Sequence, residues 1–292
     1  MSIQRYEIFN EIALRRNFAR AAEALNMSPS AVSHAIASLE AELGFSLFYR
    51  SRTTVEITKE GEKMLEHARQ VLFHEESMRE EAAAFCGLER GSVTIGAFSS
   101  VCVNWLPDII NSFRSKYPGL KVEVIQGDYD DVLEWTKAGI TDIGFETLPT
   151  NEKLTEHTLY VDPLVCVAPA GFVPVNKKTI TKKDISENVL IVQRDGYDTD
   201  TRAYLKKHKI KTHEQYYVDD DRAIIAFVEA GLGISLMPEL ALKGNDADVI
   251  KYPLELKESR TIGLIAQNKT DLSPAARTMF DFIIEYVKEI ND

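Results

Sequence analysis

Residues 18–40, FARAAEALNMSPSAVSHAIASLE, decide the fold of the N-terminal part of this 292-residue chain. Apolar residues recur on one helical face in the first half, and Asn26 then interrupts the pattern at a residue type that tolerates a sharp turn. Ser28-Pro29 predicts the start of a second helix, because serine is a preferred N-cap and proline at the first helical position gives up no hydrogen bond. The stretch therefore predicts two short helices joined by a tight turn.

The second of these helices has an apolar stripe and a polar face. Val32, Ile36 and Leu39 recur at spacings of four and three, which leaves Ser30, Ser33 and His34 facing outwards. Small polar side chains near a helix N-terminus can enter a major groove and meet base edges. An ordinary helical hairpin would show the same caps and stripe, so this segment alone leaves both interpretations open.

The flanks of this stretch complete a small domain. Ile8, Phe9 and Ile12 predict a preceding helix that closes a three-helix core, and Gly44 ends the last helix. Residues 46–58 alternate around a basic tip and predict a β-hairpin wing, whose arginines can follow phosphates or enter a narrow minor groove. We therefore expect DNA contacts from the second helix and the wing, through Ser28, Pro29, Ser30, Ser33, His34, Arg50, Arg52 and Thr53.

Residues 1 to about 90 resemble the N-terminal part of the LysR-type transcriptional regulators. The pattern "AA..L..S.SAVS..I..LE..LG..LF.R......T..G" runs through them almost without gaps. The resemblance implies a winged helix-turn-helix DNA-binding domain at residues 1–58 and double-stranded DNA as a partner. Many family members carry long donor side chains at three positions where this chain has Pro29, His34 and Ala35. Contacts of glutamine or arginine to purines therefore cannot be carried over, and the target DNA sequence stays open.

A long helix is predicted to follow, from Lys59 to about Phe85, within a linker and dimerisation segment at residues 59–90. An isolated helix of this length with a narrow apolar stripe needs a partner, either a second chain or its own domain. We favour a homodimer, which predicts a dyad-related promoter site with half-sites about 34 Å or a multiple apart. A homotetramer is implied by the resemblance, and RNA polymerase is a further candidate partner. The stripe consists of Met64, Ala68, Val71, Met78, Ala82 and Phe85, interrupted by Glu75.

Residues 91–292 alternate between strands and helices, which predicts a parallel sheet with right-handed crossovers. Two crossings, near 162 and 266, predict two hinged lobes as in a periplasmic binding protein: lobe I at 91–161 and 267–292, lobe II at 162–266. The runs "LP.I...F...YP...VEV..G" and "V..G.GI.L.P" resemble the LysR effector domain. The expected fold class is therefore α/β overall: a winged helix-turn-helix, a long linker helix, and a two-lobed α/β periplasmic-binding-protein-like effector domain.

Ligands of such sheets bind beyond the carboxyl ends of the strands. Ser99 and Ser100 lie where a strand meets a helix, so they either bind an anion or cap the helix. Glu146 would repel a carboxylate and prefer an amino group, or pair with Arg194 or Arg260; Arg194 could clamp a carboxylate or lie exposed. We expect a small organic acid or an amino-acid-like effector. The expected effector-binding residues are Ser99, Ser100, Gln126, Glu146, Thr147 and Arg194.

Composition narrows the class of protein further. No apolar run reaches membrane-spanning length and the N-terminus lacks a secretory pattern, so we expect a cytoplasmic protein without a membrane partner. Cys86, Cys102 and Cys166 fit no metal spacing or disulfide framework; reduced thiols are favoured, with a redox role for Cys102 left open. No catalytic constellation, metal site or cofactor motif appears, so we expect no enzyme and no cofactor. A solute-binding protein or an enzyme using the cleft is the alternative.

The net charge of −11 is distributed unevenly. Residues 1–58 carry equal numbers of acidic and basic side chains, so the negative excess lies outside the proposed DNA-binding domain. A DNA-binding domain without excess positive charge should bind DNA weakly as a single copy. Several copies on one DNA would sum their phosphate contacts. Oligomerisation is therefore expected on physical grounds.

Overall fold

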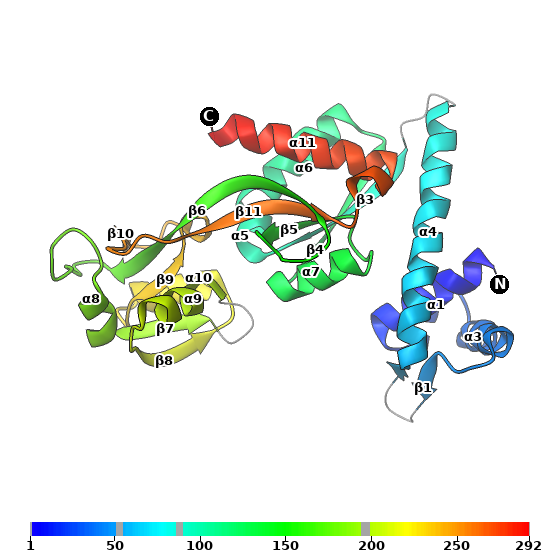
Figure 1. Ribbon diagram of the computed structural model, residues 1–292, viewed down its shortest axis with the longest axis horizontal. Helices are drawn as coiled ribbons and strands as arrows, with labels where there is room; N and C mark the ends of the chain where they lie inside the picture. Colours follow the sequence, from blue (N-terminus) through cyan, green and yellow to red (C-terminus); the bar gives the residue numbers. More distant parts are fainter. Residues whose placement is uncertain (1, 51–54, 86–89, 194–198, 292) are drawn as a thin grey trace. The chain divides into compact units, whose positions relative to one another are not determined.

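A computed structural model describes residues 2–50, 55–85, 90–193 and 199–291 (Figure 1). The chain divides into two compact units, Met1–Gly91 with Ala138–Ile140, and Ser92–Lys137 with Thr141–Asp292. The N-terminal unit consists of α1 (Ile3–Arg15), α2 (Phe18–Ala24), α3 (Pro29–Leu43), β1 (Phe48–Arg50), β2 (Val55–Ile57) and α4 (Lys59–Phe85).

The helix boundaries follow the predicted capping residues. The Ser28 hydroxyl accepts a hydrogen bond from the Ala31 N–H, and Gly44 ends α3 with a φ of 84°. Between α2 and α3, Asn26 has a φ of 53°, the left-handed conformation that asparagine tolerates. The predicted turn and both ends of α3 are therefore confirmed.

The core of the N-terminal unit joins the helices to the wing and to the start of α4. It includes the buried residues Ile8, Phe9, Ile12, Val32, Ile36, Leu39, Leu47, Phe48, Leu65 and Ala68. Thr58 caps α4 through a bond from the Gly61 N–H, and a Cβ at Gly61 would lie 2.3 Å from the Leu47 carbonyl oxygen. A side chain at Gly61 would therefore push α4 away from the wing.

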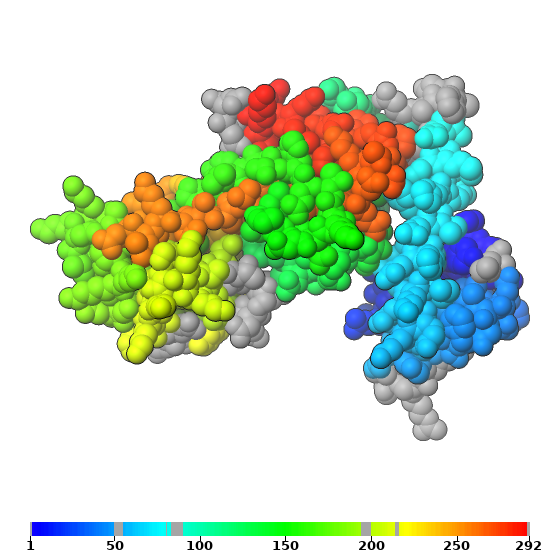
Figure 2. Space-filling view, in the orientation of Figure 1, coloured from blue at the N-terminus to red at the C-terminus, as the bar shows by residue number. Residues whose placement is uncertain are grey.

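The two halves of α4 have different surroundings within the N-terminal unit. Ala68 of the predicted dimer stripe is buried and Met64 packs against the same core, so this half packs on its own unit, the alternative considered for the stripe. Val71 and Met78 are 40% and 65% exposed; the surface of α4 is drawn in cyan in Figure 2. Among the described side chains of α4, Val71 near its middle and Met78 in its C-terminal half therefore offer apolar surface to a second chain.

The C-terminal unit begins in lobe I and ends there. Lobe I contains β3 (Gly91–Ala97), α5 (Ser99–Asn104), α6 (Leu106–Lys116), β4 (Leu120–Gln126), α7 (Tyr129–Lys137), β5 (Ile143–Thr147) and α11 (Pro274–Asn291). Lobe II contains α8 (Lys182–Glu187), β7 (Val189–Gln193), α9 (Thr199–His208), β8 (His213–Val218), α10 (Asp221–Glu229), β9 (Ser235–Pro238), η1 (Glu239–Leu242) and β10 (Val249–Pro253). Two long strands join the lobes, β6 (Thr155–Pro169) and β11 (Ser259–Ala266), and η2 (Lys269–Asp271) follows β11.

The main sheet is mixed, which corrects the prediction of a parallel sheet. Its strand order is β10-β6-β11-β5-β3-β4, with β9 paired to β6. Only β3 and β5 carry a described parallel register in this sheet, whereas β11 runs antiparallel to both β5 and β6. The connecting strands cause the difference, because β6 leaves lobe I and β11 returns to it in the opposite direction. A separate parallel pair, β7 and β8, lies in lobe II.

Separate hydrophobic clusters stabilise the two lobes. In lobe I, α6 and α11 pack through Ile109, Phe113, Phe280 and Ile283 onto the sheet (Figure 1). In lobe II the buried residues divide between two clusters, one including Leu190 and Val192, the other Ile191, Ile224 and Val228. The lobes thus have their own cores and are joined by β6 and β11. The predicted residue bounds of the domains and lobes stay a prediction.

Candidate functional site

The predicted DNA-reading residues lie at the start of α3. Ser28, Pro29, Ser30 and His34 are exposed and Ser33 is partly buried. The Ser28 hydroxyl serves the helix itself, because it accepts from the Ala31 N–H and lies 3.0 Å from the Ser30 hydroxyl.

The wing residues are only partly described. Arg50 ends β1, which pairs antiparallel with β2, and its side chain lies outside the described residues. Arg52 and Thr53 also lie outside them. Arg5 in α1, by contrast, forms an ion pair with Glu42 at 2.9 Å and is therefore engaged within its own unit.

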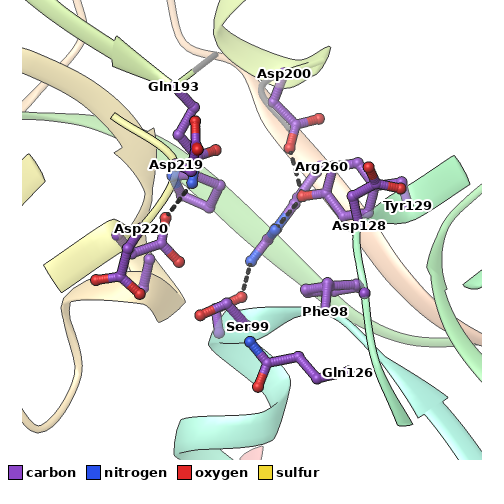
Figure 3. Close-up of a pocket in the computed structure, with 15 residues that line it drawn as sticks. Phe98, Ser99, Gln126, Asp128, Tyr129, Gln193, Asp200, Asp219, Asp220 and Arg260 are labelled. Carbon is purple, nitrogen blue, oxygen red and sulfur yellow. Dashed lines mark hydrogen bonds between the residues drawn. The ribbon is translucent and has the colours of Figure 1, made fainter. Parts of the chain in front are cut away.

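A cavity of about 220 Å³ opens between the two lobes of the C-terminal unit (Figure 3). Its lobe I wall comes from the ends of β3 and β4 and the helices that follow them. Its lobe II wall comes from the end of β7, from α9 and from the segment that joins β8 to α10. The lining residues are Phe98, Ser99, Ser100, Gln126, Gly127, Asp128, Tyr129, Gln193, Asp200, Asp219, Asp220, Asp221, Pro238, Ala241 and Arg260.

The structure brings together three of the six predicted effector residues. Ser99, Ser100 and Gln126 line the cavity, whereas Glu146 and Thr147 lie at the end of β5 and are absent from its lining. Arg194 lies outside the described residues.

Sequence reasoning missed the aspartates and Arg260. Asp128 follows a predicted strand, and Asp219 and Asp220 follow another, so the rule that ligands bind beyond strand ends could have found them. No comparable sequence signal marks Arg260, because its position depends on how β11 passes from lobe II back to lobe I.

Several protein groups hold Arg260 in place. Its Nε and Nη2 both donate to Asp162, at 2.9 and 2.7 Å, and Nη2 also donates to the Ser100 hydroxyl at 2.8 Å. Nη1 donates to the Tyr129 hydroxyl, and the guanidinium lies 4.8 Å from the centre of the Phe98 ring. Arg260 therefore pairs with Asp162 and not with Glu146. It is a buried structural cation with most of its donors engaged.

A hydrogen-bond chain through Arg260 links lobe I to lobe II. The Tyr129 hydroxyl accepts from Arg260 and donates to the Asp200 carboxylate at 3.0 Å. Tyr129 begins α7 in lobe I, and Asp200 belongs to α9 in lobe II. A change in the angle between the lobes must therefore alter this chain.

Both serines at the start of α5 already have protein partners. Ser100 is 4% exposed and accepts from Arg260, and Ser99 hydrogen-bonds to Asp221 across the cavity. Gln193 donates to the same Asp221 carboxylate at 2.8 Å. The serine hydroxyls thus connect α5 to Arg260 and to α10 before any ligand binds.

Burial disfavours the charged form of three carboxyl groups around the cavity. Burial raises the pKa of Asp221 to about 6, although the Arg260 charge acts in the opposite direction. Burial also raises the pKa of Asp200 and of Asp128. These groups would be stabilised as anions by an added positive charge.

Glu146 is the most perturbed carboxyl group near this wall. It is 4% exposed; its Oε1 accepts from the Thr147 N–H at 2.7 Å, and its Oε2 has no hydrogen-bond partner among the described residues. Burial raises the pKa of Glu146 to about 8, and the charges of Asp130, Asp200 and Asp128 act in the same direction. At neutral pH the group is therefore mostly protonated.

Other chemistry has little support in the described part of the chain. Burial raises the pKa of Cys102 to about 11, which keeps it a thiol and makes it a poor redox nucleophile. Within the described ranges no group of His, Cys, Asp and Glu is arranged to hold a metal ion. Nor is any helix in those ranges both long enough and apolar enough to cross a bilayer.

Comparison with known proteins places the chain in a family of DNA-binding regulators. The family model described as the LysR substrate binding domain matches residues 87–288, and that of the bacterial regulatory helix-turn-helix protein, lysR family, matches residues 3–62. The chain belongs to the LysR family: it is a DNA-binding transcriptional regulator with an effector-binding domain, and its relatives are named as regulators and not as enzymes.

Individual relatives match along the whole chain. The protein named as the uncharacterized HTH-type transcriptional regulator YvbU of Bacillus subtilis is 31% identical over 99% of both chains. A full-length OxyR variant from Pseudomonas aeruginosa has the same fold, with a TM-score of 0.79 at 22% identity over 99% of this chain and 95% of that chain. The effector binding domain of QuiR, solved in complex with shikimate, gives a TM-score of 0.61 at 20% identity. The match covers 68% of this chain and 98% of that domain.

Proposed function

We propose that this regulator senses a small polar molecule in the cavity between its lobes and that occupancy changes how it binds promoter DNA. The observation that supports this most directly is the cavity itself, which has polar side chains from both lobes and the hydrogen-bond chain from Tyr129 to Asp200 across it. A ligand that contacts both walls favours one lobe angle over another. Differential binding of this kind is what shifts a conformational equilibrium.

DNA recognition is proposed for the N-terminal unit, with residues 1–58 as the DNA-binding domain. The exposed start of α3 offers short polar side chains to base edges, while the wing contacts the sugar-phosphate backbone or the minor groove. The proposed contacts are Ser28, Pro29, Ser30, Ser33, His34, Arg50, Arg52 and Thr53.

The assembly is proposed to be a homodimer formed through residues 59–90, with a homotetramer as its higher form. The exposed Val71 and Met78 support pairing through the middle and the C-terminal half of α4. Two heads related by a dyad would read a dyad-related promoter site. We place the protein in the cytoplasm, where promoter DNA and RNA polymerase are its partners.

The effector is proposed to be a small organic acid or an amino-acid-like molecule bound by residues 91–292. The solved QuiR domain of the same fold is described in complex with shikimate, a small polar molecule. Ser99, Ser100 and Gln126 lie where such a ligand would meet lobe I.

The direct test is binding to the DNA upstream of the protein's own gene. Fluorescence anisotropy with the full-length chain should show binding that weakens as salt rises, because phosphate contacts release counterions. Arg52→Ala and Ser33→Ala should lower the affinity. Binding that is independent of salt and unchanged in both variants would contradict the proposal for the head.

A second measurement tests the cavity. Metabolites are screened by thermal shift on the full-length protein, since a ligand that binds the native state raises its melting temperature. Ala241→Trp, which places a large side chain in the cavity, should abolish both the shift and the change in DNA binding. A ligand that still regulates the filled variant would place the sensor elsewhere.

A further inference from the structure

The wall of the cavity is strongly acidic. Its described lining residues contribute five carboxylates and a single guanidinium, that of Arg260. Asp128 belongs to lobe I and the other four belong to lobe II, so the negative charge surrounds the cavity and is not confined to one loop. In Figure 3 Asp219 and Asp220 lie to the left of Arg260, Asp128 to its right and Asp200 above it.

Arg260 does not supply the positive charge that a carboxylate ligand would need. Both Nε and Nη2 donate to Asp162, and Nη2 and Nη1 also donate to Ser100 and Tyr129. The charge of Arg260 is thus matched by Asp162, whose side chain is fully buried beside it. An anion entering the cavity would meet like charges, and the described lining offers no cation that is not already engaged; like charges brought together are destabilising.

A second, independent observation comes from Glu146. Its side chain is buried, and Oε2 has no hydrogen-bond partner among the described residues. The charges of Asp130, Asp200 and Asp128 act on Glu146, and two of these aspartates line the cavity, although Glu146 itself does not. A buried polar atom without a partner is costly, and a donor that arrives with a ligand would remove that cost.

A metal ion does not explain this arrangement. The carboxylates are spread around the cavity, and among the described residues no three of them converge on a common point where a cation could be coordinated. An ammonium group needs no such convergence, because each of its hydrogens can meet a carboxylate from a different direction.

We propose that the effector carries at least one amine cation, as an amino acid or a short diamine does, and that Asp221 and Asp128 bind that amine from opposite lobes. This inference rests on the proposed sensing role of the cavity and narrows its ligand class. Phe98, Pro238 and Ala241 supply an apolar surface for the carbon skeleton. A ligand held by both aspartates draws lobe II toward lobe I, which gives the amine itself the differential contact that regulation requires.

The experiment is calorimetric titration of the full-length protein with putrescine, cadaverine, lysine and leucine. Each probe is paired with an analogue in which hydroxyl groups replace the amines, and simple carboxylic acids of similar size form a further series. At least one amine should bind tenfold or more tightly than its hydroxyl analogue and than the acids. Its affinity should fall as ionic strength rises, because the contact is between charges.

Two substitutions locate the amine. Asp221→Asn and Asp128→Asn keep the side-chain shape, and each should weaken the bound amine at least tenfold, while the hydroxyl analogue is unaffected. Asp108→Asn, in the first turn of α6 and exposed, is the matched control and should leave the affinity unchanged. Thermal melting of each variant verifies that it is folded.

The outcomes separate this inference from the proposed function. If none of the amines binds, or if an acid binds as tightly as the amines, the inference is overturned. An acid whose binding is lost in Ala241→Trp would nevertheless leave the sensing role of the cavity intact. If a regulating ligand binds Ala241→Trp as well as it binds the original protein, the proposed function fails together with the inference.

Discussion

Arg260 and Asp162 face each other across the antiparallel β6–β11 pair, with Nη2 of the arginine 2.7 Å from Oδ2 of the aspartate. Their side chains are 3% and 0% exposed. The pair lies on the two strands that join the lobes. It fixes the guanidinium group of Arg260, which holds Ser100 and Tyr129 directly and Asp200 through Tyr129. One buried ion pair thus organises both walls of the cavity.

Replacing Arg260 should destabilise the C-terminal unit strongly. Arg260→Met leaves Asp162 as an uncompensated buried charge, and breaking a buried pair in this way costs about 3–5 kcal/mol. Urea unfolding followed by tryptophan fluorescence measures it, because Trp105 and Trp135 both lie in this unit. Lys183→Met removes an exposed ion pair with Glu187 and should change little. Equal effects of the two substitutions would show that the buried pair is energetically unimportant.

Tyr129→Phe should weaken the connection between the lobes. The substitution removes the hydroxyl that donates to Asp200 and accepts from Arg260, which leaves two buried charged groups with one partner fewer. We expect a loss of about 1.5–3 kcal/mol, the range for hydrogen bonds to charged groups. Urea unfolding measures the loss, with Tyr49→Phe, an exposed tyrosine on the wing, as the control. An unchanged unfolding free energy would mean that this chain of hydrogen bonds contributes nothing to stability.

Stability should depend on pH through Glu146. Its pKa is about 8 in the folded protein against an ordinary value of 4.5, so the folded state binds a proton that the unfolded state has released. This contribution is fully present below about pH 4.5 and is lost as pH rises through about 8. Glu146→Gln should therefore gain stability relative to the original protein as pH is raised, by up to a few kcal/mol at about 1.4 kcal/mol per pKa unit.

Chemical denaturation at a series of pH values measures this difference. The exposed Glu123→Gln on β4 is the matched control, against which the pH dependence of Glu146→Gln is compared. A constant difference for Glu146→Gln would mean that Glu146 titrates normally.

His34→Ala should lower affinity for the promoter without lowering the melting temperature. His34 is exposed on α3, so its removal leaves no cavity, whereas loss of one good base contact costs about 1–3 kcal/mol, or roughly five- to 150-fold in affinity. Fluorescence anisotropy with the upstream DNA measures the change. His67→Ala, an exposed histidine on α4, controls for loss of an imidazole. Equal affinities for the two variants would remove His34 from the reading surface.

Charge on the exposed part of α4 should separate the proposed dimer. Val71→Asp and Met78→Asp place carboxylates on side chains that are 40% and 65% exposed in the single chain, so folding of the N-terminal unit is preserved while burial against a second α4 becomes costly. Sedimentation velocity should show a shift toward monomer. Val175→Asp, at a valine that is 59% exposed in lobe II, should leave the mass unchanged. A dimer that persists in both α4 variants would place the interface elsewhere.

The helix-turn-helix could be predicted in detail because its signals are local. The Ser28 cap, the left-handed Asn26 and the Gly44 terminus each depend on the conformational preference of one residue and its nearest backbone neighbours. The stripe of Val32, Ile36 and Leu39 follows from helical periodicity alone, and all three are buried. Family membership was recognisable for the same reason, since a long run of such signals is specific.

The direction of the main sheet could not be predicted, because strand–helix alternation reports only the strands that helices connect. Strands β6 and β11 belong to both lobes, and their antiparallel pairing depends on the path of the chain through lobe II. The predicted stripe on α4 failed in its first half for a related reason: periodicity marks which side chains are buried but not whether the neighbour is the same chain.

The sequence by itself determined the DNA-binding head, the long helix, the two-lobed sensor and the serines and glutamine at the strand ends. Those features follow from residue preferences, periodicity and the rule that ligands lie beyond the carboxyl ends of strands. Only the tertiary structure decided that Arg260 is matched by Asp162, that Ser99 and Ser100 are already bonded, and that aspartates from both lobes surround the cavity. The charge that a ligand meets depends on which side chains converge in space, and residues such as Asp128 and Asp221 become neighbours of one cavity only when the chain has folded.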